Sequence, residues 1–298
     1  MKLHSAQRPL AKKSLGQNFL VDQDVIDRIL NAVGPTETNL IIEIGPGAGA
    51  LTKSLVDSDA SVIALELDRE LIPLLREKFE SEPNFRLIEA DALEVEFCEI
   101  VASSNIGTRL PAPANDADSA LTYVRDSAFE LPDAGGSDRA KLVANLPYYI
   151  STAILQRLAE QRECFSTLVL MFQREVVERI TAEPGNSERG FLTVLVEAAF
   201  SVEKLFDVPP TAFRPVPKVW SSVVRLTPKP KSFADEPQFR ELISTAFAQK
   251  RKTILNNMKH LRPNAAESLK KANIAANRRA ETLSLDEWIA LYSLLSRN

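Results

Sequence analysis

The amino-acid sequence predicts an α/β domain built on a parallel sheet, followed by a small helical domain. Short apolar segments alternate with amphipathic ones through the first half of the chain, an order that is typical of parallel strand pairing. A glycine-rich turn follows the first apolar segment, and the residues after about 233 have helical spacing. We therefore expect an α/β domain at residues 1–228 and a helical domain at 233–298.

The first elements follow from apolar spacing and capping residues. Residues 22–33 place apolar side chains at helical spacing, with Asp22 as the N-cap. Apolar runs ending at polar residues predict three strands, and amphipathic stretches predict the helices between them. These strands are expected at 40–44, 61–65 and 85–88, and the helices at 50–56 and 69–79.

The periodic pattern breaks over residues 99–139. This stretch is rich in Ala, Ser, Pro, Asp and Gly and carries seven acidic against three basic side chains. We interpret it as a mobile acidic insertion, because it holds too few apolar residues to pack a core; the alternative is a folded lid over the active site. Deleting residues 103–136 should leave cofactor affinity, measured by titration calorimetry, nearly unchanged. A large loss of affinity would show that the insertion is not peripheral.

The strand pattern resumes at residue 141 and continues to the C-terminal region. The expected strands are 141–144, 167–172, 201–207 and 219–226, and the expected helices are 151–161, 173–182, 190–200, 237–248, 250–261, 265–272 and 285–296. Residues 227–231, Thr-Pro-Lys-Pro-Lys, are typical of a linker between domains.

Composition narrows the class of protein. No apolar run approaches the roughly 18 residues that span a bilayer, and the N-terminus has no apolar core of a secretion signal. Cys98 and Cys164 lack the spacing of a metal site. We therefore expect a cytoplasmic protein without membrane contact and with two incidental reduced thiols. Nothing suggests an obligate interface, so a monomer is expected.

The net charge of -4 conceals a strong asymmetry. Residues 1–20 carry four basic and no acidic side chains, and residues 204–298 carry 17 basic against 8 acidic. Both ends of the chain are therefore basic, and they flank an acidic middle. This distribution favours a polyanion-binding surface beside a separate small-molecule site, although basic residues also simply solvate exposed helices.

Three successive strand ends supply groups that suit a nucleoside cofactor. The turn Gly45-Pro46-Gly47-Ala48-Gly49 lets the backbone approach a ligand and opens a helix whose N–H groups face it. Glu66, 21 residues after Gly45, is placed to accept both ribose hydroxyls, and Asp91 to accept from the adenine amine. Each acid alone is equally well a solvated strand end. The series does not distinguish NAD from S-adenosylmethionine.

The segment Asn145-Leu146-Pro147-Tyr148 after the fourth strand favours methyl transfer. The exocyclic amine of adenine is a poor nucleophile, and two hydrogen-bond acceptors, the side-chain oxygen of Asn145 and the carbonyl of Leu146, would make its nitrogen more tetrahedral. Pro147 stiffens the turn, and Tyr148 offers a ring on which an extruded base can stack. Direct transfer by positioning needs no metal. The alternative is a helix cap, with Asn capping and Pro in the first turn.

The sequence resembles the ribosomal RNA small-subunit adenine dimethyltransferases, the KsgA family, over nearly the whole chain outside residues 99–139. Six motifs carry the resemblance together: Lys12 to Leu20 (KKSLGQNFL), Glu43 to Gly47 (EIGPG), Asn145 to Ile150 (NLPYYI), Phe213 to Val219 (FRPVPKV), Arg251 to Thr253 (RKT) and Glu281 to Ser284 (ETLS).

The resemblance implies a Rossmann-like S-adenosylmethionine-dependent methyltransferase domain followed by a small helical domain. It implies that Asn18 and Leu20 close over the cofactor beside Gly45, Gly47, Glu66, Asp91 and Asn145. Two adjacent adenosines near the 3′ end of small-subunit (16S) ribosomal RNA, in a pre-30S particle, would be the substrate. Phe213 would be a second stacking ring, or else a core aromatic. RNA phosphates would contact basic side chains, namely Lys12, Lys13, Arg214, Lys218, Lys250, Arg251 and Lys252.

Three other functions remain open at this point. A large-subunit RNA adenine methyltransferase of the antibiotic-resistance type would share the fold and the catalytic segment. An assembly or transcription factor would keep the cofactor fold without catalysis. An NAD-dependent oxidoreductase would use the glycine-rich turn, but it leaves the segment at Asn145 and the basic tail unexplained.

Overall fold

The computed structural model of the chain describes residue 12 and residues 16–36, 39–104, 139–230, 233–259 and 264–296. The described residues form two compact units. The first comprises the described residues up to Ile154 with Glu163–Arg174 and Glu203–Leu226, and the second comprises Leu155–Arg162, Glu175–Val202 and the described residues from Thr227. No helix in these ranges is both long and apolar enough to cross a membrane.

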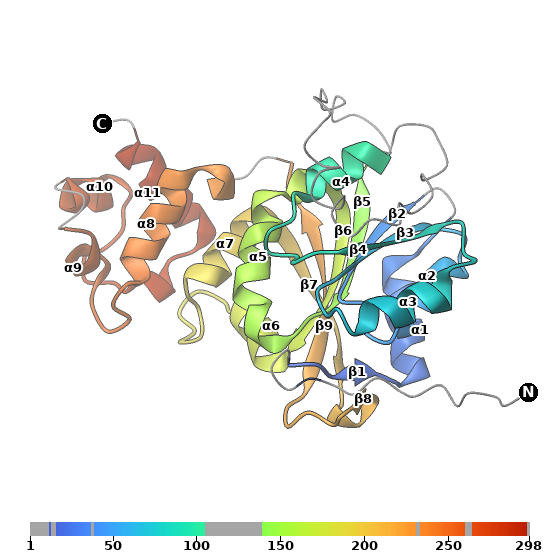
Figure 1. Cartoon of the computed structure of the whole chain (residues 1–298). Helices are drawn as coiled ribbons and strands as arrows, with labels where there is room; N and C mark the ends of the chain where they lie inside the picture. Colours follow the sequence, from blue (N-terminus) through green and yellow to red (C-terminus); the bar gives the residue numbers. More distant parts are fainter. Residues whose placement is uncertain are drawn as a thin grey trace, which may run out of the picture. The chain divides into compact units, whose positions relative to one another are not determined.

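A seven-stranded sheet runs through the α/β fold in the order β4-β3-β2-β5-β6-β9-β7 (Figure 1). Its strands are β2 (Leu40–Ile44), β3 (Ser61–Glu66), β4 (Phe85–Glu89), β5 (Ala140–Asn145), β6 (Phe165–Gln173), β7 (Phe200–Val208) and β9 (Ser221–Pro228). The pairings among β2 to β6 are parallel, as predicted. In contrast, β9 pairs with β6 antiparallel, so the sheet is mixed.

The helices α1 (Gln23–Val33), α2 (Ala50–Val56) and α3 (Leu71–Phe79) lie on one side of this sheet (Figure 1). The predicted start of α1 is confirmed, because the Asp22 side chain accepts a hydrogen bond from the N–H of Val25 at 3.2 Å. Gly34, with φ of 57°, ends the helix in the left-handed conformation. The apolar face of α1 is buried.

A helix, α4 (Phe97–Ser104), occupies the start of the stretch that we interpret as an insertion. The prediction that the insertion begins at residue 99 is therefore wrong, because residues 99–104 belong to this helix. Phe97, Ile100 and Val101 are buried at the i, i+3, i+4 spacing of an amphipathic helix, a signal too short to stand out beside the polar residues that follow. Residues 105–138, with the rest of the proposed insertion and its alternative as a lid, lie outside the described residues.

The expectation of two incidental thiols is also wrong, because Cys98 and Cys164 are joined as a disulfide. Their Cα atoms are 5.1 Å apart, a separation that a disulfide spans. The neighbouring rings of Phe97 and Phe165 pack edge to face, with centroids 5.5 Å apart, and both are buried. This aromatic pair brings together cysteines separated by 66 residues, which their spacing in the sequence does not reveal.

The second unit is helical. Its elements include α7 (Phe191–Ala199), α8 (Pro237–Phe247), α9 (Ile254–Met258), α10 (Ala265–Lys271) and α11 (Leu285–Leu295), while α5 (Ser151–Glu160) and α6 (Arg174–Ile180) lie mostly in it. We assign α7 to the first domain from sequence, but it packs with α8, and its side chains are buried nearly all round. The predicted helix at 250–261 is shorter than expected, since Lys250, Arg251 and Lys252 lie in a turn before α9.

A two-stranded pairing that the sequence did not suggest joins distant motifs in the first unit. The strand β1 (Phe19–Leu20) pairs antiparallel with β8 (Phe213–Arg214), so that Leu20 lies opposite Phe213. Both of these side chains are buried in the same hydrophobic cluster as α1. The N-terminal motif is thereby held at a defined place in the first unit.

Candidate active site

A cavity lies where the parallel strands β2, β3, β4 and β5 end. The register places the ends of these strands at one edge, because Ile44 pairs with both Leu65 and Ala144. The ten predicted cofactor and catalytic residues other than Phe213 all line this cavity, namely Asn18, Leu20, Gly45, Gly47, Glu66, Asp91, Asn145, Leu146, Pro147 and Tyr148. Ligands of open α/β sheets bind at this edge.

The glycine-rich turn has the conformation that requires glycine. Gly45 and Gly47 have φ of 68° and 59°, in the left-handed region that other residues rarely adopt. A Cβ on Gly47 would also lie 3.0 Å from the ring of Phe19. The turn therefore leaves room for the N-terminal motif to close over one side of the cavity.

The carboxylate of Glu66 is held rigidly by three backbone N–H groups. Its Oε1 accepts from Leu67 at 3.0 Å and from Asp68 at 2.8 Å, and its Oε2 accepts from Gly47 at 3.2 Å. Burial raises the pKa of Glu66, and these backbone hydrogen bonds oppose the rise. A carboxylate has about four acceptor sites, so these three hydrogen bonds leave one site, on Oε2, for a ligand hydroxyl.

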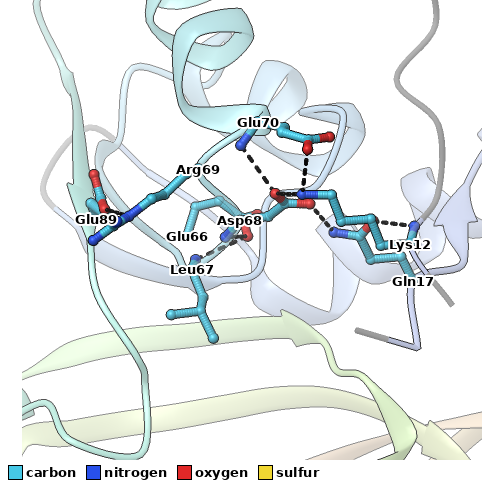
Figure 2. Close-up of polar contacts among 8 residues, drawn as sticks. All are labelled: Lys12, Gln17, Glu66, Leu67, Asp68, Arg69, Glu70 and Glu89. Atoms are coloured by element: carbon cyan, nitrogen blue, oxygen red, sulfur yellow. Dashed lines mark hydrogen bonds and ion pairs between the residues drawn. The ribbon is translucent and has the colours of Figure 1, made fainter. Parts of the chain in front are cut away.

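Asp68 fastens the N-terminal motif beside Glu66, a contact that the sequence did not predict (Figure 2). Its Oδ1 accepts from Lys12 Nζ at 2.7 Å and its Oδ2 from Gln17 Nε2 at 2.8 Å. Burial by itself would raise the pKa of Asp68, but the hydrogen bonds from Lys12 and Gln17 outweigh it and lower that pKa. Lys12 also pairs with Glu70 at 3.1 Å, so its ammonium is engaged by two carboxylates.

Glu43 is a buried carboxyl in the lining of the cavity. From the sequence it is named only as the first residue of the motif Glu43 to Gly47, without a role of its own. Its Oε2 accepts from the hydroxyl of Thr52 at 2.7 Å. Burial raises the pKa of Glu43 to about 7, the Thr52 hydrogen bond opposes this, and the charge of Glu66 adds to it. Asp91, after β4, accepts from the N–H of Leu93 at 2.9 Å through Oδ1. The cavity is therefore lined by three carboxyl groups.

The catalytic segment leaves the sheet at the end of β5. The side-chain Nδ2 of Asn145 donates to the carbonyl of Asn18 at 3.2 Å. A short 3-10 turn begins only at Tyr148, and its cap is Pro147, so Asn145 does not cap a helix as the alternative interpretation requires. Within the described residues, neither Asn145 Oδ1 nor the carbonyl of Leu146 accepts a hydrogen bond.

The ring of Tyr148 is held by a contact with β9. Its hydroxyl lies 3.2 Å from Oγ of Ser221, the first residue of β9. Burial raises the pKa of Tyr148, and the contact with Ser221 opposes the rise. The phenol therefore stays neutral near pH 7, and the hydrogen bond restricts rotation of the ring.

The other predicted site residues are not part of the cavity lining. Phe213 is only 1% exposed and belongs to the hydrophobic cluster, which agrees with the core alternative for this aromatic. Five of the predicted RNA-binding side chains are exposed, and none has an ion pair in the described part of the chain: Arg214, Lys218, Lys250, Arg251 and Lys252. Lys13 lies outside the described residues.

The fold and this cavity define a Rossmann-like methyltransferase, in which a glycine-rich turn and strand-end carboxylates face an Asn-Leu-Pro-Tyr segment. Residues 9–297 match the family model described as ribosomal RNA adenine dimethylase. The chain belongs to the ribosomal RNA adenine dimethylase family. It is an S-adenosylmethionine-dependent RNA adenine dimethyltransferase, and this membership excludes the oxidoreductase alternative.

Individual relatives agree with the family model. "Ribosomal RNA small subunit methyltransferase A" of Hahella chejuensis is 39% identical, covering 94% of this chain and 91% of its own length, and that of Geobacter metallireducens is 38% identical, covering 94% of each. A dimethyladenosine transferase structure from Plasmodium falciparum is 25% identical with a TM-score of 0.69, covering 92% and 95%. The structure of 23S rRNA methyltransferase ErmE, at 24% identity and a TM-score of 0.64, covers 94% and 100% and shares the fold.

The residues of the cavity fit S-adenosylmethionine. Its sulfonium and amino groups are cationic, and the cavity is lined by the carboxyl groups of Glu43, Glu66 and Asp91. The left-handed glycine turn leaves space where a side chain would fill the approach. Leu65, Ala92 and Leu93 provide apolar contact in the same lining, as a purine ring requires.

Replacing Asp68 with Asn should weaken S-adenosylmethionine binding about tenfold, because it removes the carboxylate that accepts hydrogen bonds from Lys12 and Gln17 and so holds the N-terminal motif. The loss is expected because the fastened residues 16–20 line the cavity. Titration calorimetry measures the affinity, and Lys12→Met should have a similar effect. Glu70→Gln is the matched control, since Glu70 also pairs with Lys12, at 3.1 Å, but is exposed and does not contact Gln17 in the described part of the chain. Unchanged affinity in Asp68→Asn would show that the contact does not position the motif.

Proposed function

We propose that this enzyme methylates N6 of two adjacent adenosines, twice each, near the 3′ end of small-subunit (16S) ribosomal RNA. The relatives named as small subunit methyltransferases, at 38–39% identity over most of the chain, support this substrate over the large-subunit alternative. The proposed partner is the pre-30S particle, and the enzyme acts as a monomer in the cytoplasm, where such particles assemble.

The proposed chemistry centres on the two acceptors of the catalytic segment, and one observation carries it. Because Asn145 donates through Nδ2 to Asn18, its Oδ1 is oriented as an acceptor in the cavity lining. Oδ1 and the carbonyl of Leu146 would each accept one proton of the adenine amine, which localises the nitrogen lone pair for attack. Holding the two reactants in this geometry lowers the activation barrier of a direct displacement, because their translational and rotational freedom is already lost on binding.

The base and the cofactor would be held by separate sets of residues. Tyr148 stacks on the extruded base, with Pro147 stiffening the turn beneath it. The carboxylate of Glu66 accepts the ribose hydroxyls, Asp91 accepts the adenine amine, and the backbone of Asn18, Leu20, Gly45 and Gly47 encloses the cofactor. S-adenosylmethionine supplies the methyl group on its sulfonium. We keep Phe213 as a core residue that sets β8 against β1.

The RNA surface is proposed on exposed basic residues. Arg214 ends β8, and Lys218 lies in the loop between β8 and β9. Lys250, Arg251 and Lys252 belong to the helical region 233–298, which we propose as the RNA-binding domain. Lys12 is the exception among the described candidates, because Asp68 and Glu70 already engage its ammonium. Phosphate contacts of this kind add affinity without sequence information.

The test is incorporation of labelled methyl groups from S-adenosylmethionine into unmethylated small and large ribosomal subunits. Label should appear in the small-subunit RNA alone, as dimethyladenosine at two adjacent positions near the 3′ end. Label in the large-subunit RNA would support the antibiotic-resistance type instead. No label in either would contradict the proposed substrate.

A further inference from the structure

The loop between β8 and β9 carries exposed apolar side chains to which neither the cavity nor the proposed phosphate contacts assign a role. Its apolar side chains are Val216, Val219 and Trp220, which are 55%, 38% and 47% exposed. Arg214, the last residue of β8, and Lys218, in the loop, are exposed, and neither has an ion pair with a described acidic residue. Large aromatic side chains are normally covered in a folded protein, so such a cluster indicates a partner.

The strand register places this loop beside the catalytic segment. Asn145 of β5 pairs with Met171 of β6, and two residues further along β6 Gln173 pairs with Ser221 of β9. The carbonyl of Trp220 then accepts from the N–H of Arg174 at 2.9 Å. Trp220 therefore lies at the same edge of the sheet as the segment, two strands away, which corresponds to about 10 Å.

A hydrogen bond connects the loop directly to the proposed base-stacking ring. Ser221, which follows Trp220, is fully buried, and its Oγ contacts the hydroxyl of Tyr148 at 3.2 Å. The backbone at Trp220 is thus anchored on both sides, by Arg174 and by Ser221, while its side chain stays exposed. An anchored backbone with an exposed indole suits stacking on a flat ligand, because little conformational entropy is lost on contact.

We propose that Trp220 stacks on a nucleotide that flanks the target adenosine, while Arg214 and Lys218 contact the phosphates of the same unpaired strand. Aromatic platforms with adjacent cations are how proteins hold single-stranded nucleic acid. Charge favours this occupant, because Arg214 and Lys218 are exposed and neither pairs with a described carboxylate. The cations of this loop attract the phosphates of an RNA strand. The inference rests on the proposed RNA substrate.

Trp220→Ala should raise the KM for unmethylated small-subunit particles about tenfold, since a stacked base contributes on this scale when its aromatic platform is removed. The kcat at saturating particles should change less than about twofold, because Trp220 is a positioning residue outside the cavity lining. S-adenosylmethionine affinity should be unchanged. Trp220→Phe should restore most of the KM, which a loop that had merely lost its packing would not show.

The charged part of the loop has its own readout. Lys218→Gln should reduce the slope of the logarithm of KM against the logarithm of salt concentration by about one phosphate contact. Lys53→Gln is the matched control, because Lys53 is an exposed lysine of the same unit that already pairs with Asp57 at 3.0 Å. Its slope should equal that of the unaltered enzyme.

Fluorescence reports the contact without catalysis. The chain has two tryptophans, and Trp288 is fully buried, so a ligand stacking on the surface should quench Trp220 alone. Single-stranded oligoadenylate should quench the emission of the full chain, and Trp220→Phe should abolish the effect.

Three results would overturn the proposal while leaving the proposed function standing. They are an unchanged KM in Trp220→Ala, no rescue by Trp220→Phe, and emission unaffected by oligoadenylate. A KM effect that persists with quenching absent would point to a ribosomal protein as the occupant, which also overturns it. Failure of the proposed function itself would appear differently, as absence of label when the unaltered enzyme meets small subunits.

Discussion

Asn145→Ala should lower kcat for methyl transfer by about 10²–10³, the loss seen when one preorganised hydrogen-bonding group is removed from a reacting centre. The change removes Oδ1, one of the two proposed acceptors, and also Nδ2, which orients it against Asn18. Transfer of label from S-adenosylmethionine under single-turnover conditions measures the chemical step. RNA binding should persist, because the phosphate contacts lie elsewhere.

Asn145→Asp separates the two functions of the side chain. It keeps an acceptor oxygen but loses donation to Asn18, so we expect activity between that of Asn145→Ala and that of the unaltered enzyme. Normal methylation by Asn145→Ala, with binding of both ligands intact, would show that the acceptor argument is wrong.

Glu43 should make the stability of the protein fall as the pH rises toward 7. Its folded-state pKa of about 7 lies above its ordinary value of 4.5, so the folded state binds the extra proton between these values. The stabilisation is complete below about pH 4.5 and is lost as the pH rises through the folded pKa, amounting to about 3 kcal/mol. Urea unfolding at a series of pH values measures it.

The unaltered protein is compared with the variant Glu43→Gln, which has no titratable group at this position. Other titrating residues affect both proteins alike, so the free energy of unfolding of the unaltered protein minus that of the variant should fall by about 3 kcal/mol between pH 4.5 and 8. Thr52→Ser, which keeps the hydroxyl that contacts Glu43, is the control and should retain the trend. A difference independent of pH would contradict the raised pKa.

Local patterns in the sequence determined most of the elements. Apolar spacing and Asp22 predicted α1, and the short apolar runs predicted the strands that carry Gly45, Glu66 and Asn145. Because parallel strands end at one edge of a sheet, strand order along the chain was enough to group the cofactor and catalytic residues. These are consequences of backbone geometry that any chain of this pattern must follow.

Only the tertiary structure decided the contacts between segments far apart in the chain. Three such contacts join residues whose spacing carries no periodic signal: the salt bridge of Lys12 with Asp68, the pairing of Leu20 with Phe213 and the disulfide of Cys98 with Cys164. The burial of Phe213 accompanies the second of these contacts. Lys12 illustrates the reason. Its charge alone suggested RNA, but whether an ammonium meets a phosphate or a carboxylate depends on which groups the folded chain places within a few ångströms of it.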